Sequence, residues 1–142
     1  MVLIDANLLI YAHFSSLPEH EAARLWLDKR LNERTRVGLP WPSLLAFLRI
    51  ATNVRAFQRP DSLATAWRQV EAWLSCENVW IPTPGDAHAT VLAHMLELSG
   101  GGDRVPDAHL AALAIEHGLM LCSSDRDFAR FTGLKWENPL AK

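Results

Sequence analysis

Four aspartates lie where an apolar segment of the chain gives way to a helix. Asp5 follows one such segment, and Asp125 and Asp127 follow another. Asp107 stands in the first turn of a helix. Two carboxylates ~5 Å apart repel by about 3 kcal/mol at an effective dielectric near ~20, so a crowded group needs a cation. Oxygen ligands suit Mg²⁺ or Mn²⁺, and two such ions can clamp both reacting oxygens of a phosphodiester.

The same positions also have a purely structural interpretation. Aspartate is favoured at helix N-termini as a cap and through the helix dipole, and Ser124-x-x-Asp127 resembles a capping box. The histidines offer no alternative metal site, because His88 and His94 are six residues apart and face different sides of a helix. GxSxG, P-loop and GxGxxG motifs are missing from the sequence. The aspartates are therefore the candidates for chemistry.

Four short apolar segments are expected to form the strands that position these aspartates, at residues 2–4, 37–39, 79–81 and 119–122. Helical spacing is found at residues 8–13, 18–32, 43–52, 62–74, 86–98 and 106–117, and a short last helix ends near residue 131. Ser43 is the expected cap of the third helix. This alternation predicts an α/β fold with a short parallel β-sheet sandwiched by helices.

The predicted sheet would bring the aspartates together. Ligands of open parallel sheets bind outside the carboxyl ends of the strands, so Asp5 and Asp125 are expected at one edge. Asp107 is in register with the apolar face of its helix, formed by Leu110, Ala111 and Ala114. Its carboxylate is therefore expected to point toward that same edge.

Composition sets the class of protein. The 142 residues are 49% apolar and 21% charged, which indicates a single globular domain, residues 1–142, and excludes a disordered chain. Apolar runs stay below the ~18 residues of a membrane span, and Asp5 breaks the apolar start too early for a signal peptide. Cys76 and Cys122 are expected to be buried thiols of a cytoplasmic protein. Helices rich in Trp and Leu favour a homodimer.

Positive charge is concentrated in one part of the chain, although the net charge is −2. Residues 24–68 carry nine Lys and Arg against three Asp and Glu, whereas residues 69–142 carry five against ten. A basic block beside an acidic site favours a phosphate-rich ligand. Solvated helix faces explain the same arginines equally well.

Three segments in order resemble a PIN domain, and in detail the VapC-type toxins of bacterial toxin–antitoxin pairs. They are residues 2–7 (VLIDAN), 106–114 (PDAHLAALA) and 122–128 (CSSDRDF), and the resemblance extends to the closing residues 133–140. It implies a short parallel sheet between helices, in agreement with the fold predicted above. It also implies a metal-dependent endoribonuclease that cleaves RNA such as tRNA or rRNA and is held in check by a VapB-type antitoxin.

The resemblance assigns roles to particular residues. It implies Mg²⁺ or Mn²⁺ ligation by Asp5, Asp107, Asp125 and Asp127, with the first three acting in catalysis. Asn7 and Ser123 match positions that buttress those carboxylates. On this interpretation Arg49, Arg55 and Arg59 hold the RNA backbone, and Arg126 lies near the cleaved phosphate.

One position departs from the family pattern. Many members carry a glutamate before the Phe-Leu-Arg of the helix after the second strand, where this chain has Ala46. Asp103 is predicted to compensate in part, if its helix extends that far. The alternative function is therefore an RNA-binding or antitoxin-binding protein with weakened or lost catalysis. A phosphatase with Asp5 as nucleophile is disfavoured, because Asn7 stands where such enzymes need a second acid.

Overall fold

The computed structural model describes residues 1–141 and has a five-stranded parallel sheet at its centre. Its strands are β1 (Val2–Ile4), β2 (Val37–Gly38), β3 (Val79–Trp80), β4 (Met120–Cys122) and β5 (Trp136–Glu137), in the order β3-β2-β1-β4-β5. β1 pairs with β4 over its full length, with Ile4 opposite Cys122. The predicted α/β fold is confirmed. The PIN-like arrangement implied by the resemblance agrees with it.

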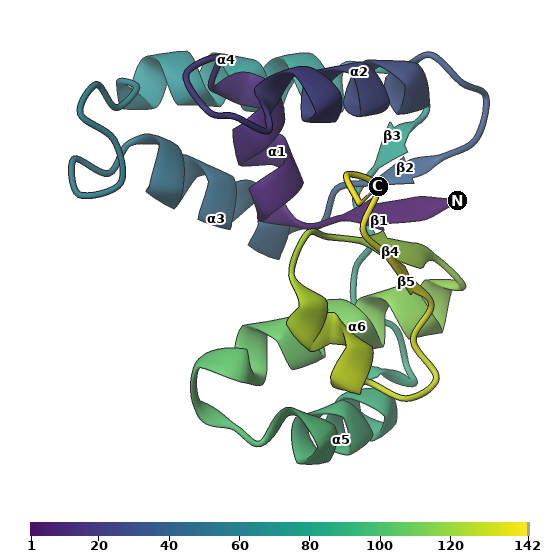
Figure 1. Cartoon of the computed structure of the whole chain (residues 1–142). Coiled ribbons are helices and arrows are strands. Elements are labelled where there is room, and N and C mark those ends of the chain that lie inside the picture. Colours follow the sequence, from purple (N-terminus) through teal and green to yellow (C-terminus); the bar gives the residue numbers. More distant parts are fainter. Residues whose placement is uncertain (142) are drawn as a thin grey trace.

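Helices cover both faces of this sheet (Figure 1). One layer holds α1 (Ala6–His13), α2 (His20–Leu31), α3 (Trp41–Ala51) and α4 (Leu63–Leu74). The other holds α5 (His88–Ser99) and α6 (Val105–His117), together with the 3₁₀ helices η1 (Gly102–Arg104) and η2 (Arg126–Arg130). Among the described residues, no helix is long and apolar enough to cross a membrane.

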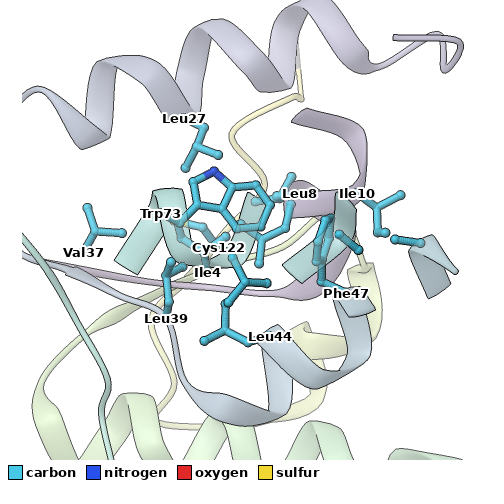
Figure 2. Close-up of a cluster of buried hydrophobic side chains, with 14 of the residues drawn as sticks. Ile4, Leu8, Ile10, Leu27, Val37, Leu39, Leu44, Phe47, Trp73 and Cys122 are labelled. Atoms are coloured by element: carbon cyan, nitrogen blue, oxygen red, sulfur yellow. The ribbon is translucent and has the colours of Figure 1, made fainter. Parts of the chain in front are cut away.

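The two layers have separate cores because successive strand residues face opposite sides of the sheet. Ile4 and Cys122 belong to the core under α1–α4, where Trp73 lies among Leu8, Leu27 and other buried side chains (Figure 2). Leu3, in contrast, packs with the buried face of α6, which includes Ala111 and Leu113. Both faces of β1 are therefore buried, which explains its wholly apolar sequence.

Three predictions about local structure were wrong. β5 was missed, because a two-residue edge strand leaves no periodic pattern. Ser43 does not cap α3: the helix begins at Trp41 after an extended Pro40, and the buried Ser43 hydroxyl has no hydrogen-bond partner among the described residues. Cys122 is buried as expected, but Cys76 is only partly buried.

Candidate functional site

The carboxyl ends of β1 and β4 bring Asp5 and Ser123 together, as the sheet register requires. The Ser123 hydroxyl is fully buried and donates to Oδ2 of Asp5 at 2.8 Å. It also accepts hydrogen bonds from Nδ2 of Asn7 at 3.1 Å and from the backbone N–H of Asp125 at 3.0 Å. Ser123 thus joins three polar groups of the strand ends, and its contact with Asn7 agrees with the supporting roles implied for both residues.

Asp5 is held in place before any ligand binds. It is the N-cap of α1, and its Oδ1 accepts from the backbone N–H of Ala6 at 2.8 Å. Burial raises the pKa of this carboxyl, the hydrogen bonds from Ser123 and Ala6 oppose that rise, and the nearby Asp125 adds to it. Its charged form is therefore costly until a cation is near.

Asp107 lies in the first turn of α6, where Pro106 is tolerated because its missing N–H would be unpaired there. Burial, followed by the charges of Asp5, Asp125 and Asp127, raises the pKa of Asp107 to about 6, while Arg104 acts in the opposite direction. Asp107, Asp125 and Asp127 line the same cavity, and Asp5 is joined to the Asp125 backbone through Ser123. The structure therefore brings together the four aspartates that sequence analysis selected.

An open cavity of about 410 Å³ lies against this cluster. Its lining residues are Gly101, Asp103, Arg104, Asp107, Asp125 and Asp127. Asp125 is the N-cap of η2, and its Oδ1 accepts from the backbone N–H of Asp127 at 2.9 Å. Asp103 belongs to η1 rather than to an extended α6, but it does reach the cavity.

Arg104 is the residue at this site that sequence analysis missed. Its Nη1 lies 2.5 Å from Oδ2 of Asp127. One feature of the sequence could have pointed to Arg104. It lies between the glycines at positions 100–102 and the helix that carries Asp107. All three glycines have positive φ angles, and non-glycine residues rarely adopt these.

The donors fit a hard divalent cation in chemistry. Within residues 1–141 no three His, Cys, Asp or Glu side chains are grouped tightly enough to form a metal site as they stand. The candidate donors are nonetheless all carboxylate oxygens, which Mg²⁺ and Mn²⁺ prefer. The described residues give the Asp107 carboxylate no hydrogen-bond donor, and burial, followed by the charges of neighbouring carboxylates, raises its pKa.

The four predicted RNA-binding arginines do not line the cavity. All four are exposed: Arg49 on α3, Arg55 and Arg59 in the α3–α4 connection, and Arg126 at the start of η2. No ion pair within residues 1–141 involves them. They are therefore available to a ligand that extends beyond the cavity.

A family model described as "PIN domain" matches residues 2–134. The chain belongs to the PIN domain family. It is 44% identical over 142 residues to ribonuclease VapC37 of Mycobacterium tuberculosis, covering 99% of both proteins. It is 41% identical over 141 residues to ribonuclease VapC33 of the same species, again covering 99% of each. Within the PIN domain family it is thus a VapC-type member.

Solved structures agree with the fold. VapBC2 from Rickettsia felis, solved bound to a DNA fragment from its promoter, matches with a TM-score of 0.71 at 16% sequence identity. The match covers 97% of this chain and 98% of the other. At this identity the likeness concerns the fold, and it extends over the whole PIN domain.

Proposed function

We propose that this VapC-type protein is a metal-dependent endoribonuclease and the toxin of a toxin–antitoxin pair. The observation that carries the proposal is the cavity lined by Asp107, Asp125 and Asp127, with Asp5 joined to the Asp125 backbone through the Ser123 hydroxyl. Full-length identity to VapC ribonucleases supports RNA as the substrate.

Each residue has a role that follows from its contacts. Asp5, Asp107, Asp125 and Asp127 would hold Mg²⁺ or Mn²⁺, with the first three essential for cleavage. Such an ion lowers the pKa of bound water and stabilises charge on a phosphate. Ser123 orients Asp5 and the Asp125 backbone through its hydroxyl, and Asn7 holds that hydroxyl in turn. Asp103 adds negative charge to the cavity wall, in partial compensation for Ala46.

The arginines outside the cavity bind the RNA backbone in this proposal. Arg49 lies in the last turn of α3, and Arg55 and Arg59 follow in the connection to α4. Replacing these three with Gln should reduce the salt dependence of RNA binding, by close to one unit of log slope for each phosphate that is no longer bound. An unchanged slope would remove them from the interface. Arg126, beside Asp125 in the chain, is assigned to the phosphate nearest the cleavage point.

Two protein partners complete the proposal. A VapB-type antitoxin binds the toxin and blocks the acidic site in the cytoplasm. A second copy of the chain packs on apolar side chains of α3, α4 and the segment between them, where large residues remain exposed: Trp41, Leu45, Val54, Leu63 and Trp67. Light scattering of the antitoxin-free protein should give twice the monomer mass, and a monomer would refute the dimer.

Cleavage of total bacterial RNA by purified, antitoxin-free protein tests the activity. Reactions contain Mg²⁺, Mn²⁺ or EDTA and are run beside the Asp5→Asn variant. Discrete fragments that require metal and vanish in the variant are expected. Intact RNA in every lane would favour the catalytically weakened alternative. Ala46→Glu then decides, because only a site disabled by the missing glutamate regains cleavage.

A further inference from the structure

Arg104 is a cation built into the acidic cavity by the protein itself. Its guanidinium lies 2.5 Å from the Asp127 carboxylate, and this hydrogen bond raises the pKa of Arg104 further. The charges of Asp125 and Asp107 act on it in the same direction. Asp127 is the only acceptor that residues 1–141 give to this side chain. Most of its five N–H donors are therefore free to bind another oxygen-rich group.

The geometry points to a shared role for this side chain. We propose that Arg104 is a phosphate-binding residue that pairs with Asp127 in the free protein and transfers to an RNA phosphate once a divalent cation occupies the aspartates. This inference rests on the proposed ribonuclease function. A planar guanidinium suits bidentate phosphate binding, and Arg104 already lines the cavity beside Asp107 and Asp125.

The balance of charge at the cavity explains why the transfer would occur. The cavity is lined by four aspartates (Asp103, Asp107, Asp125 and Asp127) and Arg104, which together leave a net charge of about −3 when all are ionised. This charge repels a phosphate. A bound divalent cation competes with Arg104 for Asp127, because both are attracted to the same carboxylate. The ion pair is also partly open to water, with 35% of the Arg104 side chain and 46% of the Asp127 side chain exposed. An exposed pair of this kind costs little to separate.

The surroundings permit such a movement and leave Asp127 partnered. Arg104 follows Gly100, Gly101 and Gly102, a run without side chains to pack against the rest of the protein. Arg130 lies on the other side of Asp127, with Nη2 at 4.0 Å from Oδ1. Arg130 itself is tied to the carbonyl oxygen of Ser99 at 2.9 Å. It is thus the fixed cation of the pair, and Arg104 is the exchangeable one.

The Arg104→Gln variant tests both parts of the proposal, the pairing with Asp127 and the binding of an RNA phosphate. The control is Arg34→Gln, which removes the same charge from an exposed arginine. Arg34 precedes β2 and therefore lies near the amino ends of the strands, whereas the cavity lies at their carboxyl ends. Mn²⁺ affinity is measured by calorimetry without RNA. Binding of end-labelled bulk tRNA is measured across a salt series with Ca²⁺ present, so that a divalent cation with oxygen ligands occupies the aspartates. Arg104→Gln should bind Mn²⁺ about three- to tenfold more tightly than the control. It should bind tRNA about tenfold more weakly, with a salt slope smaller by about 1.

Arg104→Lys keeps the charge but loses the fork of donors, so it should retain the salt slope and recover only part of the tRNA affinity. The inference is overturned if Arg104→Gln matches Arg34→Gln in either measurement while the parent protein binds Mn²⁺ and cleaves RNA. A parent protein that does neither would instead refute the proposed function, and the inference with it. Circular dichroism verifies that all variants are folded.

Discussion

Helix α6 belongs to two clusters of titratable side chains that differ in how their polar atoms are partnered. Near its N-terminus, Asp107 faces other carboxylates and has no hydrogen-bond donor among the described residues. Toward its C-terminus, Glu116 contacts Nδ1 of His88 and accepts from the backbone N–H of Gly85 at 3.1 Å. His88 in turn lies 3.1 Å from Nδ1 of His109 through its Nε2.

The Glu116 cluster is partnered in a way that favours stability, whereas the Asp107 cluster is suited to bind a cation. Glu116 is only 5% exposed, yet both of its oxygens are partnered, so its burial is compensated. Asp107 and Asp5 have raised pKa values because burial and neighbouring carboxylates disfavour their charged forms. Among these carboxylates only Asp107 has neither a hydrogen-bond donor nor an ion-pair partner among the described residues. The Glu116–His88 pair ties α5 to α6, whereas the aspartates are the groups that we propose for the chemistry.

The largest expected effect is on activity. Asp107→Asn should lower RNA cleavage by about 100-fold or more, the usual cost of losing a charged group that stabilises a phosphoryl transition state. Glu116→Gln, the matched change at the other end of α6, should leave the cleavage rate of the folded protein within about twofold. Cleavage rates at saturating Mg²⁺ measure both. Equal losses would remove the distinction between the two clusters.

The second expected effect is on stability, and it falls on the Glu116 cluster rather than on the aspartates. Glu116→Ala leaves His88 and the Gly85 N–H without their acceptor, so it should lower the free energy of unfolding by about 2 kcal/mol. The control is Glu97→Ala, which removes an exposed carboxylate of α5 and should cost less than about 0.5 kcal/mol. Urea denaturation followed by circular dichroism measures both. A Glu116→Ala variant as stable as the control would show that the pair does not hold the helices together.

The third prediction concerns pH. The pKa of Asp107 rises from 3.8 to about 6 in the folded protein. The folded state therefore binds its proton more tightly than the unfolded state, and the stability this contributes is present below pH ~4 and lost as the pH rises through ~6. After discounting for solvent screening, the loss for the metal-free protein is about 1 kcal/mol.

Asp107→Asn should remove that part of the pH dependence. Thermal unfolding of parent and variant in EDTA at several values between pH 4 and 7.5 tests this expectation. The parent should lose stability relative to the variant across the interval, and added Mn²⁺ should restore the parent at the upper end. Parallel curves for the two proteins would contradict the assignment of the pKa to Asp107.

The smallest expected effect on stability concerns two buried hydroxyl groups, one with hydrogen-bond partners and one without. Ser43 and Ser99 are both 1% exposed, but only Ser99 is satisfied: its hydroxyl donates to the carbonyl oxygen of Leu96 and accepts from the N–H of Gly101. Ser43→Ala should therefore raise the free energy of unfolding by up to about 1 kcal/mol, because a buried unpaired hydroxyl is removed. Ser99→Ala should lower it by about 1 kcal/mol. Urea denaturation distinguishes the signs.

Local sequence patterns predict some of these features and not others. The first four strands were predictable because short apolar segments alternate with helices, and this placed Asp5 and Asp125 at one edge of the sheet. The pair Glu116–His88 was not predictable, since its members are 28 residues apart on different helices. Periodicity identifies the face that a residue occupies, and it does not identify the partner on the facing helix.

The α/β class, the position of the four aspartates at the starts of helices and their suitability for a hard cation follow from the sequence alone. Those properties depend on residue type and short-range spacing, which the chain carries directly. Only the tertiary structure decided that Ser123 links Asp5, Asn7 and Asp125, and that Arg104 lies against Asp127. It also decided that β5 completes the sheet. Apart from the local hydrogen bond between Ser123 and Asp125, these contacts join segments distant in sequence, so packing selects them and no local pattern records them.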